Sequence, residues 1–221
     1  METKPISLVR QAQQLISMAI TEGDSVIDAT VGNGKDTLFL TSAVGPQGTV
    51  YGFDIQAAAI EKTRELLNKH DRLNSKLTLQ CHSKIAQTLA LENITPSISA
   101  AMFNLGYLPG SDKKVVTQSN TTLTALDSIL PLLAKTACIT ILAYRGHPGG
   151  ETEADAIKLY CNTLNNDLYH SKIYLGNHAT TDCYPGKNPP HNNNLSNSQA
   201  TNTIDNIPPI LYVIQKNYSN A

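Results

Sequence analysis

The sequence is poor in aromatic residues and in charge. Of its 221 residues none is Trp and only 3 are Phe, so a surface that stacks on a nucleobase must use Tyr, Phe, His or Arg. Charged residues make up 16% of the chain, and the formal net charge is −1 at pH 7. A protein that binds nucleic acid mainly through bulk positive charge is therefore disfavoured, although the composition leaves room for a local basic groove.

Cysteine pairs and long apolar runs are also missing. The chain has 4 cysteines, but they form no CxxC pair and no His–Cys set with zinc-finger spacing. This argues against a structural zinc and a disulfide framework, and it favours a reducing, cytoplasmic location. No apolar run approaches the ~18 residues of a membrane helix, so no membrane association is expected. Polar residues at 10, 11, 13 and 14 also interrupt any signal-peptide core.

Apolar residues nevertheless make up 41% of the chain, which is enough for a hydrophobic core. The length fits a single domain over residues 1–221. Apolar periodicity predicts a helix starting near Pro5, and further helices at 36–43, 57–69, around 126–133 and at 151–164. Short buried strands are predicted at 25–28, 49–53, 77–79, 98–103, 138–143, 169–175 and 210–214. This alternation predicts an α/β fold with a mostly parallel, doubly wound sheet that ends in an antiparallel pair.

The connection between the last two predicted strands is unusual. Residues 176–206 are rich in Asn, Pro, Ser and Thr and contain few apolar residues that could offset the entropy of ordering. We expect a flexible, Asn-rich surface insertion there, with a lid over a substrate as the alternative interpretation.

The most informative segment runs from Asp28 to Asp36, where the first predicted strand meets the next helix. Gly32 and Gly34 allow a tight turn and close approach to a ligand, and the helix start offers free N–H groups. Asp54 ends the second strand, 20 residues after Gly34. A carboxylate at this position can accept hydrogen bonds from both ribose hydroxyls of a nucleoside cofactor.

The loop does not match the two common phosphate-binding patterns. A dinucleotide site would need a third glycine where the chain has Thr37, and a P-loop would need Ser or Thr where it has Asp36. An acidic residue followed by Gly-x-Gly suits S-adenosylmethionine better, because this cofactor has no pyrophosphate. In this interpretation Asp28 holds the cofactor ammonium, directly or through water.

Four segments together resemble a known family. They are Asp28–Asp36, Phe53–Gln56, Phe103–Gly110 (sequence FNLGYLPG), and Tyr144 with Gly146–Pro148. The chain resembles the class I S-adenosylmethionine-dependent methyltransferases labelled rRNA methylases, members of which are associated with methylating 5-(aminomethyl)-2-thiouridine at the tRNA wobble position. The resemblance implies a Rossmann-like seven-stranded sheet with an antiparallel C-terminal pair. The 176–206 insertion and Arg145 depart from the family pattern.

The resemblance also implies site residues. Asn104, at the end of the fourth strand, would accept a hydrogen bond from the attacking amine, and Tyr107 would contact the flipped base. His147 would take the amine's proton, with capping of a helix or binding of a phosphate as the alternative interpretation. Cofactor contacts are expected from Asp28, Thr30, Gly32, Asn33, Gly34, Asp36, Thr37, Asp54, Gln56, His82, Ser83 and Asn104. Substrate contacts are expected from Tyr107, Pro109, Tyr144, Arg145 and His147. No metal is needed.

The resulting hypothesis is an enzyme that N-methylates the aminomethyl group of wobble 5-aminomethyl-(2-thio)uridine in the tRNA anticodon arm, with a homodimer as one way to span that arm. Three alternatives stay open: a methyltransferase of rRNA, a small-molecule methyltransferase, and a non-catalytic nucleoside-binding module. Salt-dependent RNA binding would separate the RNA enzymes from the small-molecule enzyme.

Overall fold

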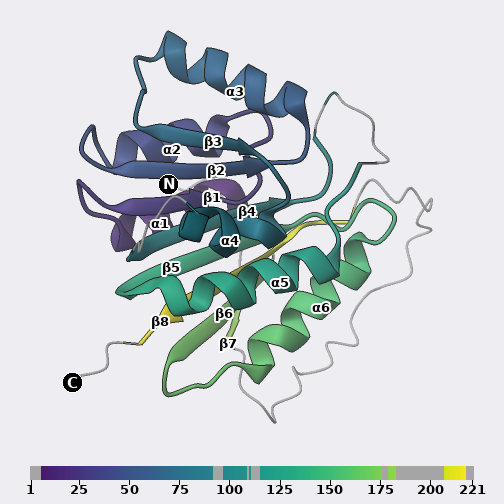
Figure 1. Ribbon diagram of the computed structural model, residues 1–221. Helices are drawn as coiled ribbons and strands as arrows, with labels where there is room; N and C mark the ends of the chain where they lie inside the picture. The colour runs from purple at the N-terminus through teal and green to yellow at the C-terminus, as the bar shows by residue number, and fades with distance from the viewer. Residues whose placement is uncertain are drawn as a thin grey trace, which may run out of the picture.

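The computed structural model describes residues 6–91, 97–108, 110, 115–175, 179–182 and 207–217 (Figure 1). Its helices are α1 (Leu8–Ala19), α2 (Lys35–Ala43), α3 (Ala57–Lys69), α4 (Ile85–Leu91), α5 (Ser119–Ile129) and α6 (Gly150–Thr163), with 3₁₀ turns η1 (His82–Lys84) and η2 (Leu130–Leu132). Its strands are β1 (Ser25–Asp28), β2 (Thr49–Asp54), β3 (Ser75–Leu79), β4 (Ile98–Leu105), β5 (Leu133–Ala143), β6 (Tyr169–Leu175), β7 (Ala179–Asp182) and β8 (Ile210–Lys216).

One mixed sheet organises the described chain. Its strand order is β3-β2-β1-β4-β5-β8-β6-β7, in which the first five strands are parallel and β8 runs antiparallel to both β5 and β6. The doubly wound sheet and its antiparallel C-terminal pair are therefore confirmed. The order reverses direction at β1 and β4, and ligands bind at such a switch point in open α/β sheets.

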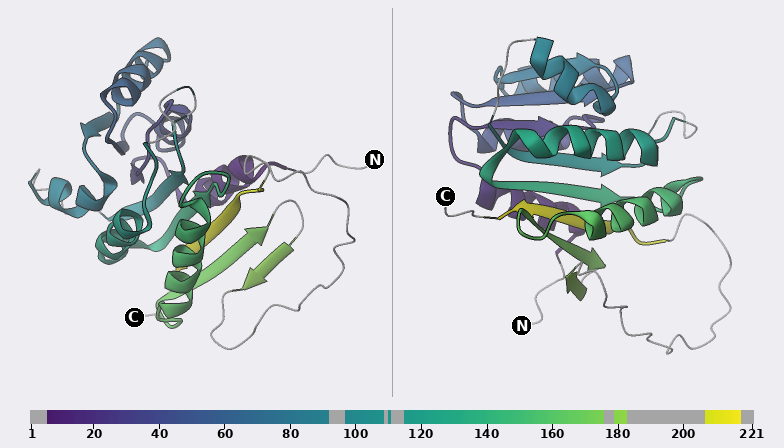
Figure 2. Two further views of the ribbon diagram at one scale, coloured as in Figure 1. Left: turned by 90° about the vertical axis from the view of Figure 1, so that its right-hand side faces the viewer. Right: turned by 60° about the horizontal axis from the view of Figure 1, so that its bottom comes forward.

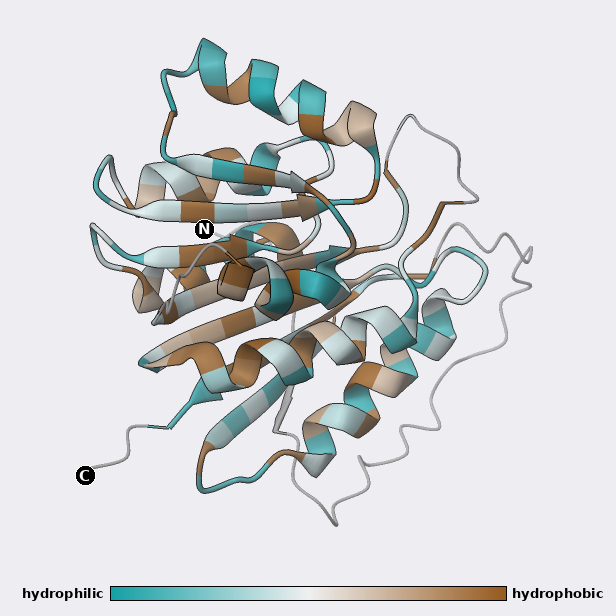
Figure 3. Cartoon of the chain, in the orientation of Figure 1, coloured by the Kyte–Doolittle hydropathy of each residue, from teal (hydrophilic) through white to brown (hydrophobic). Residues whose placement is uncertain are grey.

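Helices cover both faces of the sheet, which is why its central strands are apolar on both sides. Successive side chains of β1 point to opposite faces of the sheet. Val26 packs with α1 and α2 on one face, and Ile27 packs with α4, α5 and α6 on the other. The latter three helices lie in front of the sheet in Figure 1, and Figure 2 shows them from two further sides. Colouring by hydropathy shows apolar residues concentrated in the central strands and the helix faces that meet them (Figure 3).

Most predicted elements are confirmed, and β1 and α3 have the predicted bounds. The first helix begins at Leu8 rather than near Pro5, because the Ser7 hydroxyl caps it by accepting the Arg10 N–H. The helix predicted around 126–133 ends at Ile129, because the chain tightens at Pro131 into η2. It then enters β5, which is longer than predicted. The α4 segment carried no predicted helix, since its seven residues are too few for a clear periodic signal.

Within the described residues the sheet has eight strands, one more than expected. The additional strand, β7, falls at residues 179–182 of the segment that we interpreted as an insertion, and it pairs antiparallel with β6. Without β7, the β6 backbone would be an unpaired sheet edge. Residues 176–178 and 183–206 lie outside the described residues, so the predicted flexibility of the insertion stays a prediction.

Candidate active site

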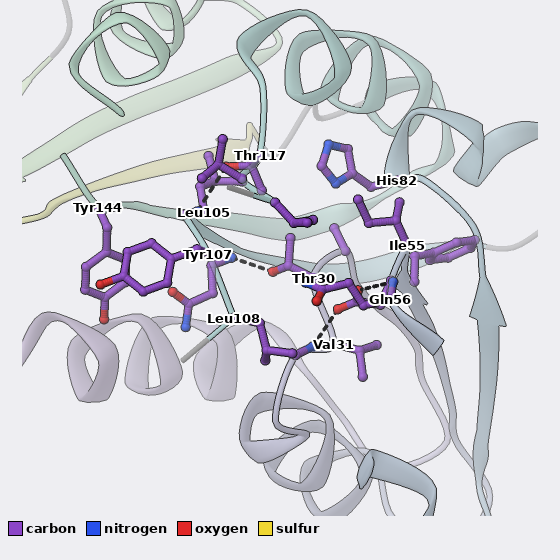
Figure 4. Close-up of a pocket in the computed structure, with 18 of the residues that line it drawn as sticks. Thr30, Val31, Ile55, Gln56, His82, Leu105, Tyr107, Leu108, Thr117 and Tyr144 are labelled. Atoms are coloured by element: carbon purple, nitrogen blue, oxygen red, sulfur yellow. Dashed lines mark hydrogen bonds between the residues drawn. The ribbon is translucent and has the colours of Figure 1, made fainter. Parts of the chain in front are cut away.

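A cavity of about 850 Å³ opens where β1, β2, β4 and β5 end (Figure 4). Eleven of the seventeen expected site residues line it: Thr30, Gly32, Asn33, Asp36, Asp54, Gln56, His82, Asn104, Tyr107, Tyr144 and His147. Five others, Asp28, Gly34, Thr37, Ser83 and Arg145, do not line it, and Pro109 lies outside the described residues.

Two residues of the Gly32–Gly34 turn, Gly32 and Asn33, line the cavity. Both glycines have positive φ, 52° and 78°, a region that disfavours other residues. A Cβ on Gly34 would lie 2.6 Å from the Thr63 hydroxyl, so Gly34 is required for packing against α3 rather than for ligand contact. The buried Asn33 Oδ1 has no hydrogen-bond partner among the described residues, and it is an acceptor available to a ligand.

Asp28 does not line the cavity, whereas we expected it to face the cofactor. It lies two residues after Val26 and so points to the same face of β1, into the layer that contains α2. There it accepts hydrogen bonds from the Thr37 hydroxyl (2.6 Å) and the Thr30 N–H (3.2 Å). Burial, and then the charge of Asp36, raise the pKa of Asp28 to about 7. Asp28 and Thr37 therefore stabilise the conformation of the loop between β1 and α2 through hydrogen bonds on the side away from the cavity.

Asp36 is the carboxylate that faces the cavity in its place. Its two oxygens accept hydrogen bonds from Gln13 Nε2 (2.9 Å) and Asn104 Nδ2 (3.2 Å). These contacts join the start of α2 to α1 on one side and to the end of β4 on the other. The sequence reasoning missed Gln13, because on an amphipathic helix it looks like any polar outward residue.

Asp54 is held rigidly at the end of β2. Its two oxygens accept the N–H groups of Gly32 (2.9 Å) and Gln56 (2.8 Å). Each carboxylate oxygen has a second lone pair, so the pair of oxygens can still accept from two neighbouring hydroxyls. This is the arrangement expected for ribose recognition, and the half-exposed Ile55 beside it offers an apolar surface to a base.

His82 forms the opposite wall of this part of the cavity. Its ring contacts Phe103 edge-on, its Nε2 lies 3.2 Å from the Thr121 hydroxyl, and it bonds to the backbone of Ala29. Burial lowers its pKa to about 4, so the ring is neutral at pH 7 and presents an uncharged wall. The neighbouring Ser83 bonds to Cys81 Sγ instead, and it is Cys81 that lines the cavity.

Asn104 occupies the end of β4 with its orientation fixed. Its N–H donates to Thr30 Oγ1 (2.7 Å), and its side-chain amide donates to Asp36 (3.2 Å). A carboxylate only accepts, so the NH₂ group must face Asp36 and the carbonyl oxygen must point the other way. The side chain can therefore accept a hydrogen bond from a group in the cavity.

His147 and Tyr107 both line the cavity, and their rings are in contact. Their rings are perpendicular with centroids 6.1 Å apart. His147 Nδ1 lies 3.1 Å from the Pro148 carbonyl, which can only accept, so a neutral His147 carries its proton on Nδ1. Its Nε2 then has a free lone pair, and this atom is buried with no hydrogen-bond partner in the described part of the chain.

Tyr144 and Arg145, the two remaining residues expected to contact the substrate, lie in different places. Tyr144 lines the cavity, and burial together with the nearby Asp36 charge raises its pKa (Figure 4). Arg145 turns away and donates from Nε to the Pro208 carbonyl (3.1 Å), so it anchors the chain that leads into β8. The described residues contain no group of three or more metal-ligating side chains and no helix that could span a membrane.

The residues present suit S-adenosylmethionine. Asp36 lies next to Asn104, and a carboxylate there would stabilise a cationic amino-acid moiety. Asn33, whose Oδ1 has no hydrogen-bond partner among the described residues, lines the same cavity. Asp54 offers acceptors for a ribose, and Ile55, Phe53 and Cys81 offer apolar contacts for a base. No cluster of cationic side chains of the kind that binds a pyrophosphate lines the described cavity.

Solved structures share this fold. A structure described as a "putative rRNA-methylase" from Clostridium thermocellum has a TM-score of 0.78 and 31% identity, covering 97% of this chain and 100% of that one. A structure described as a "putative methyltransferase" from Streptococcus mutans, solved in complex with SAH, has a TM-score of 0.71 and 31% identity, with 98% and 99% covered. Fold and site together define a class I S-adenosylmethionine-dependent methyltransferase.

Residues 50–182 match the model of the family described as "Putative rRNA methylase". The match extends over more than half of the chain, which therefore belongs to this family. A curated relative, the chloroplastic tRNA (mnm(5)s(2)U34)-methyltransferase of Arabidopsis thaliana, is 41% identical in an alignment 154 residues long that covers 66% of this chain. The matched part spans 55% of the length of that relative.

Proposed function

We propose that this protein transfers a methyl group from S-adenosylmethionine to the amine of a wobble 5-aminomethyl-(2-thio)uridine in the anticodon arm of tRNA. One observation carries the proposal: the acceptor-bearing side chains of Asn104 and His147 line the same cavity as Asp54 and Ile55, which suit a nucleoside. The name of the Arabidopsis relative, which specifies a modified uridine at position 34 of tRNA, supports the choice of substrate.

The cofactor supplies an already activated methyl group, so the chain has to orient the partners and manage one proton. Asp36 and Asn33 would hold the charged amino-acid end, and Asp54 would hold the ribose. These contacts fix the donor by its ends and leave the region beside Asn104 for the acceptor.

The acceptor amine is the nucleophile and must be uncharged when it attacks. A protonated alkylamine first gives a proton to His147, whose Nε2 lone pair is free, either directly or through a water molecule. The Asn104 carbonyl oxygen accepts one of the remaining N–H bonds, which aims the nitrogen lone pair away from Asn104. Tyr107 and Tyr144 provide the aromatic surfaces on which an unstacked base can rest.

A methyltransferase acting on rRNA is the second candidate, because the family description itself favours it. Nucleoside mass spectrometry distinguishes the two. The protein is incubated with the cofactor and either tRNA carrying 5-aminomethyluridine or ribosomal subunits, and the RNA is then digested. Formation of the methylaminomethyl nucleoside in tRNA, lost in Asp54→Ala, supports the proposal; methylation of rRNA alone refutes it in favour of the second candidate.

Two broader expectations accompany the proposal. We place the protein in the cytoplasm, in line with the free thiols of Cys81, Cys138 and Cys161. A homodimer would present a wider surface to the anticodon arm, and light scattering with and without tRNA measures the oligomeric state.

A further inference from the structure

One buried carboxylate has no part in the proposed chemistry. Glu153 lies in the first turns of α6, is 2% exposed, and does not line the cavity. Its two oxygens each accept a hydroxyl: Oε2 from Thr117 (2.6 Å) and Oε1 from Thr122 (2.8 Å). Burying a carboxylate costs several kcal/mol unless it is well hydrogen-bonded, so a glutamate here needs a reason.

Thr117 connects this carboxylate to the turn that follows β4. Its hydroxyl oxygen accepts the Gly106 N–H (3.0 Å) while its proton goes to Glu153, and its own N–H donates to the Gly106 carbonyl (2.9 Å). Tyr107 and Val116 form an antiparallel bridge immediately beside these bonds. A continuous chain of hydrogen bonds therefore runs from Glu153 through Thr117 to Gly106.

Gly106 is the residue between the two functional positions of that turn. It has a φ of 144°, which favours glycine, and Asn104 and Tyr107 lie on either side of it in the chain. A Cβ on Gly106 would lie 3.4 Å from Tyr144 Cβ and 3.7 Å from His147 Nε2, so the Gly106 backbone packs against Tyr144 and His147. A shift of this peptide would displace Asn104, Tyr107 and the His147 contact together.

We propose that Glu153 is a positioning residue, which acts through the Thr117 hydroxyl to hold the Asn104–Tyr107 turn in its reactive geometry. The charged acceptor makes the bond from Thr117 shorter and stronger than a neutral one. That bond orients the Thr117 oxygen lone pairs towards the Gly106 N–H. Thr122 donates to the other carboxylate oxygen and, within the described residues, forms no hydrogen bond with the Asn104–Tyr107 turn.

The chain offers a matched pair of variants, because Thr117→Val and Thr122→Val each remove one hydroxyl from Glu153 at nearly constant volume. Thr117→Val should lower kcat about tenfold, the equivalent of one hydrogen bond, and leave the dissociation constant of the cofactor unchanged. Thr117→Ser should restore kcat. Thr122→Val should leave kcat within about twofold of wild type, even where it lowers the Tm by as much as Thr117→Val.

The role of Glu153 itself is tested by a double-mutant cycle with Glu153→Met, a side chain of similar length that accepts no such bond. Glu153→Met should lower kcat as Thr117→Val does, and adding it to Thr117→Val should cost no further kcat, because the connection is already broken. Independent, multiplicative losses would overturn the inference, as would an unchanged kcat in Glu153→Met.

This inference rests on the proposed function for its kinetic readout, so a second readout is needed that requires no turnover. Amide hydrogen exchange at Gly106 should quicken about tenfold or more in Thr117→Val and Glu153→Met but not in Thr122→Val. If wild type transfers no methyl group but Gly106 exchange follows this pattern, the proposed substrate is wrong and the positioning role stands. If wild type is active and exchange is the same in all variants, the positioning role is refuted.

Discussion

Replacing Asp28 with Asn should make the cofactor-free protein more stable at neutral and alkaline pH, although it removes a charged group from the centre of the family motif. Asp28 is buried, and burial together with the Asp36 charge raises its pKa from 3.8 to about 7. A raised acid pKa means that folding favours the protonated form. Stability is therefore highest below pH 3.8 as far as this group is concerned, and it is lost progressively as the pH rises to 7.

The magnitude follows from the two pKa values. Each unit by which the folded-state pKa differs from the unfolded-state pKa corresponds to ~1.4 kcal/mol. The rise of the Asp28 pKa to about 7 therefore corresponds to about 4 kcal/mol of lost stability once the pH exceeds the folded-state pKa. Asn resembles the protonated acid in shape and charge, and its carbonyl oxygen can keep one of the bonds from Thr30 and Thr37. Allowing for the other bond, we expect Asp28→Asn to gain about 2–4 kcal/mol at pH 8.

Urea denaturation of both proteins from pH 4 to pH 9 measures this directly. At pH 4 the variant should be as stable as wild type or slightly less stable, because it keeps only one of the two hydrogen bonds. Its stability relative to wild type should grow towards pH 7 and stay constant above it. Asp24→Asn serves as the control, because Asp24 accepts a backbone hydrogen bond at an exposed turn. A variant that is less stable than wild type at pH 8 would show that Asp28 is held favourably as an anion, and it would refute the electrostatic account of the loop.

Three further predictions concern the same cavity. Gly34→Ala should destabilise the protein by about 1–3 kcal/mol more than Gly23→Ala in urea denaturation, because both glycines have positive φ but only a Cβ at 34 meets another residue, Thr63. Acidification should cost about 3 kcal/mol between pH 6.5 and pH 4 through His82, whose lowered pKa favours the neutral form in the folded state, and His82→Gln should abolish this component. Asn104→Ala should lower kcat about 100-fold while calorimetry shows cofactor affinity changed less than tenfold; equal losses in both would assign Asn104 to cofactor binding alone.

The nucleoside half of the site could be read from the sequence because its signals are local. A buried strand, a Gly-x-Gly turn, a helix start and an acidic residue at the next strand end follow one another within 27 residues, from Asp28 to Asp54. Parallel connections bring such segments to one edge of a sheet, so Gly32, Asp36 and Asp54 were predicted to lie together and do so.

The sequence does not show which of the two carboxylates, Asp28 or Asp36, faces the cavity. Both carboxylates belong to the motif, and which one faces the cavity depends on β-strand alternation and on Gln13, which comes from α1, 23 residues before Asp36. The Glu153 network depends on three segments that meet only in the folded chain. The sequence shows Glu153 as one of several acidic residues near a helix start, where solvent exposure is the usual outcome.

The central claim is that an amine on the wobble uridine is the acceptor of the methyl group. The most direct test uses two anticodon stem-loops that differ only at the wobble position, one with 5-aminomethyluridine and one with uridine, and a cofactor with a deuterated methyl group. The account predicts that mass spectrometry finds one deuterated methyl group on the aminomethyl nucleoside and none on the uridine stem-loop. Transfer to both stem-loops, or to neither while ribosomal RNA is labelled, would contradict it.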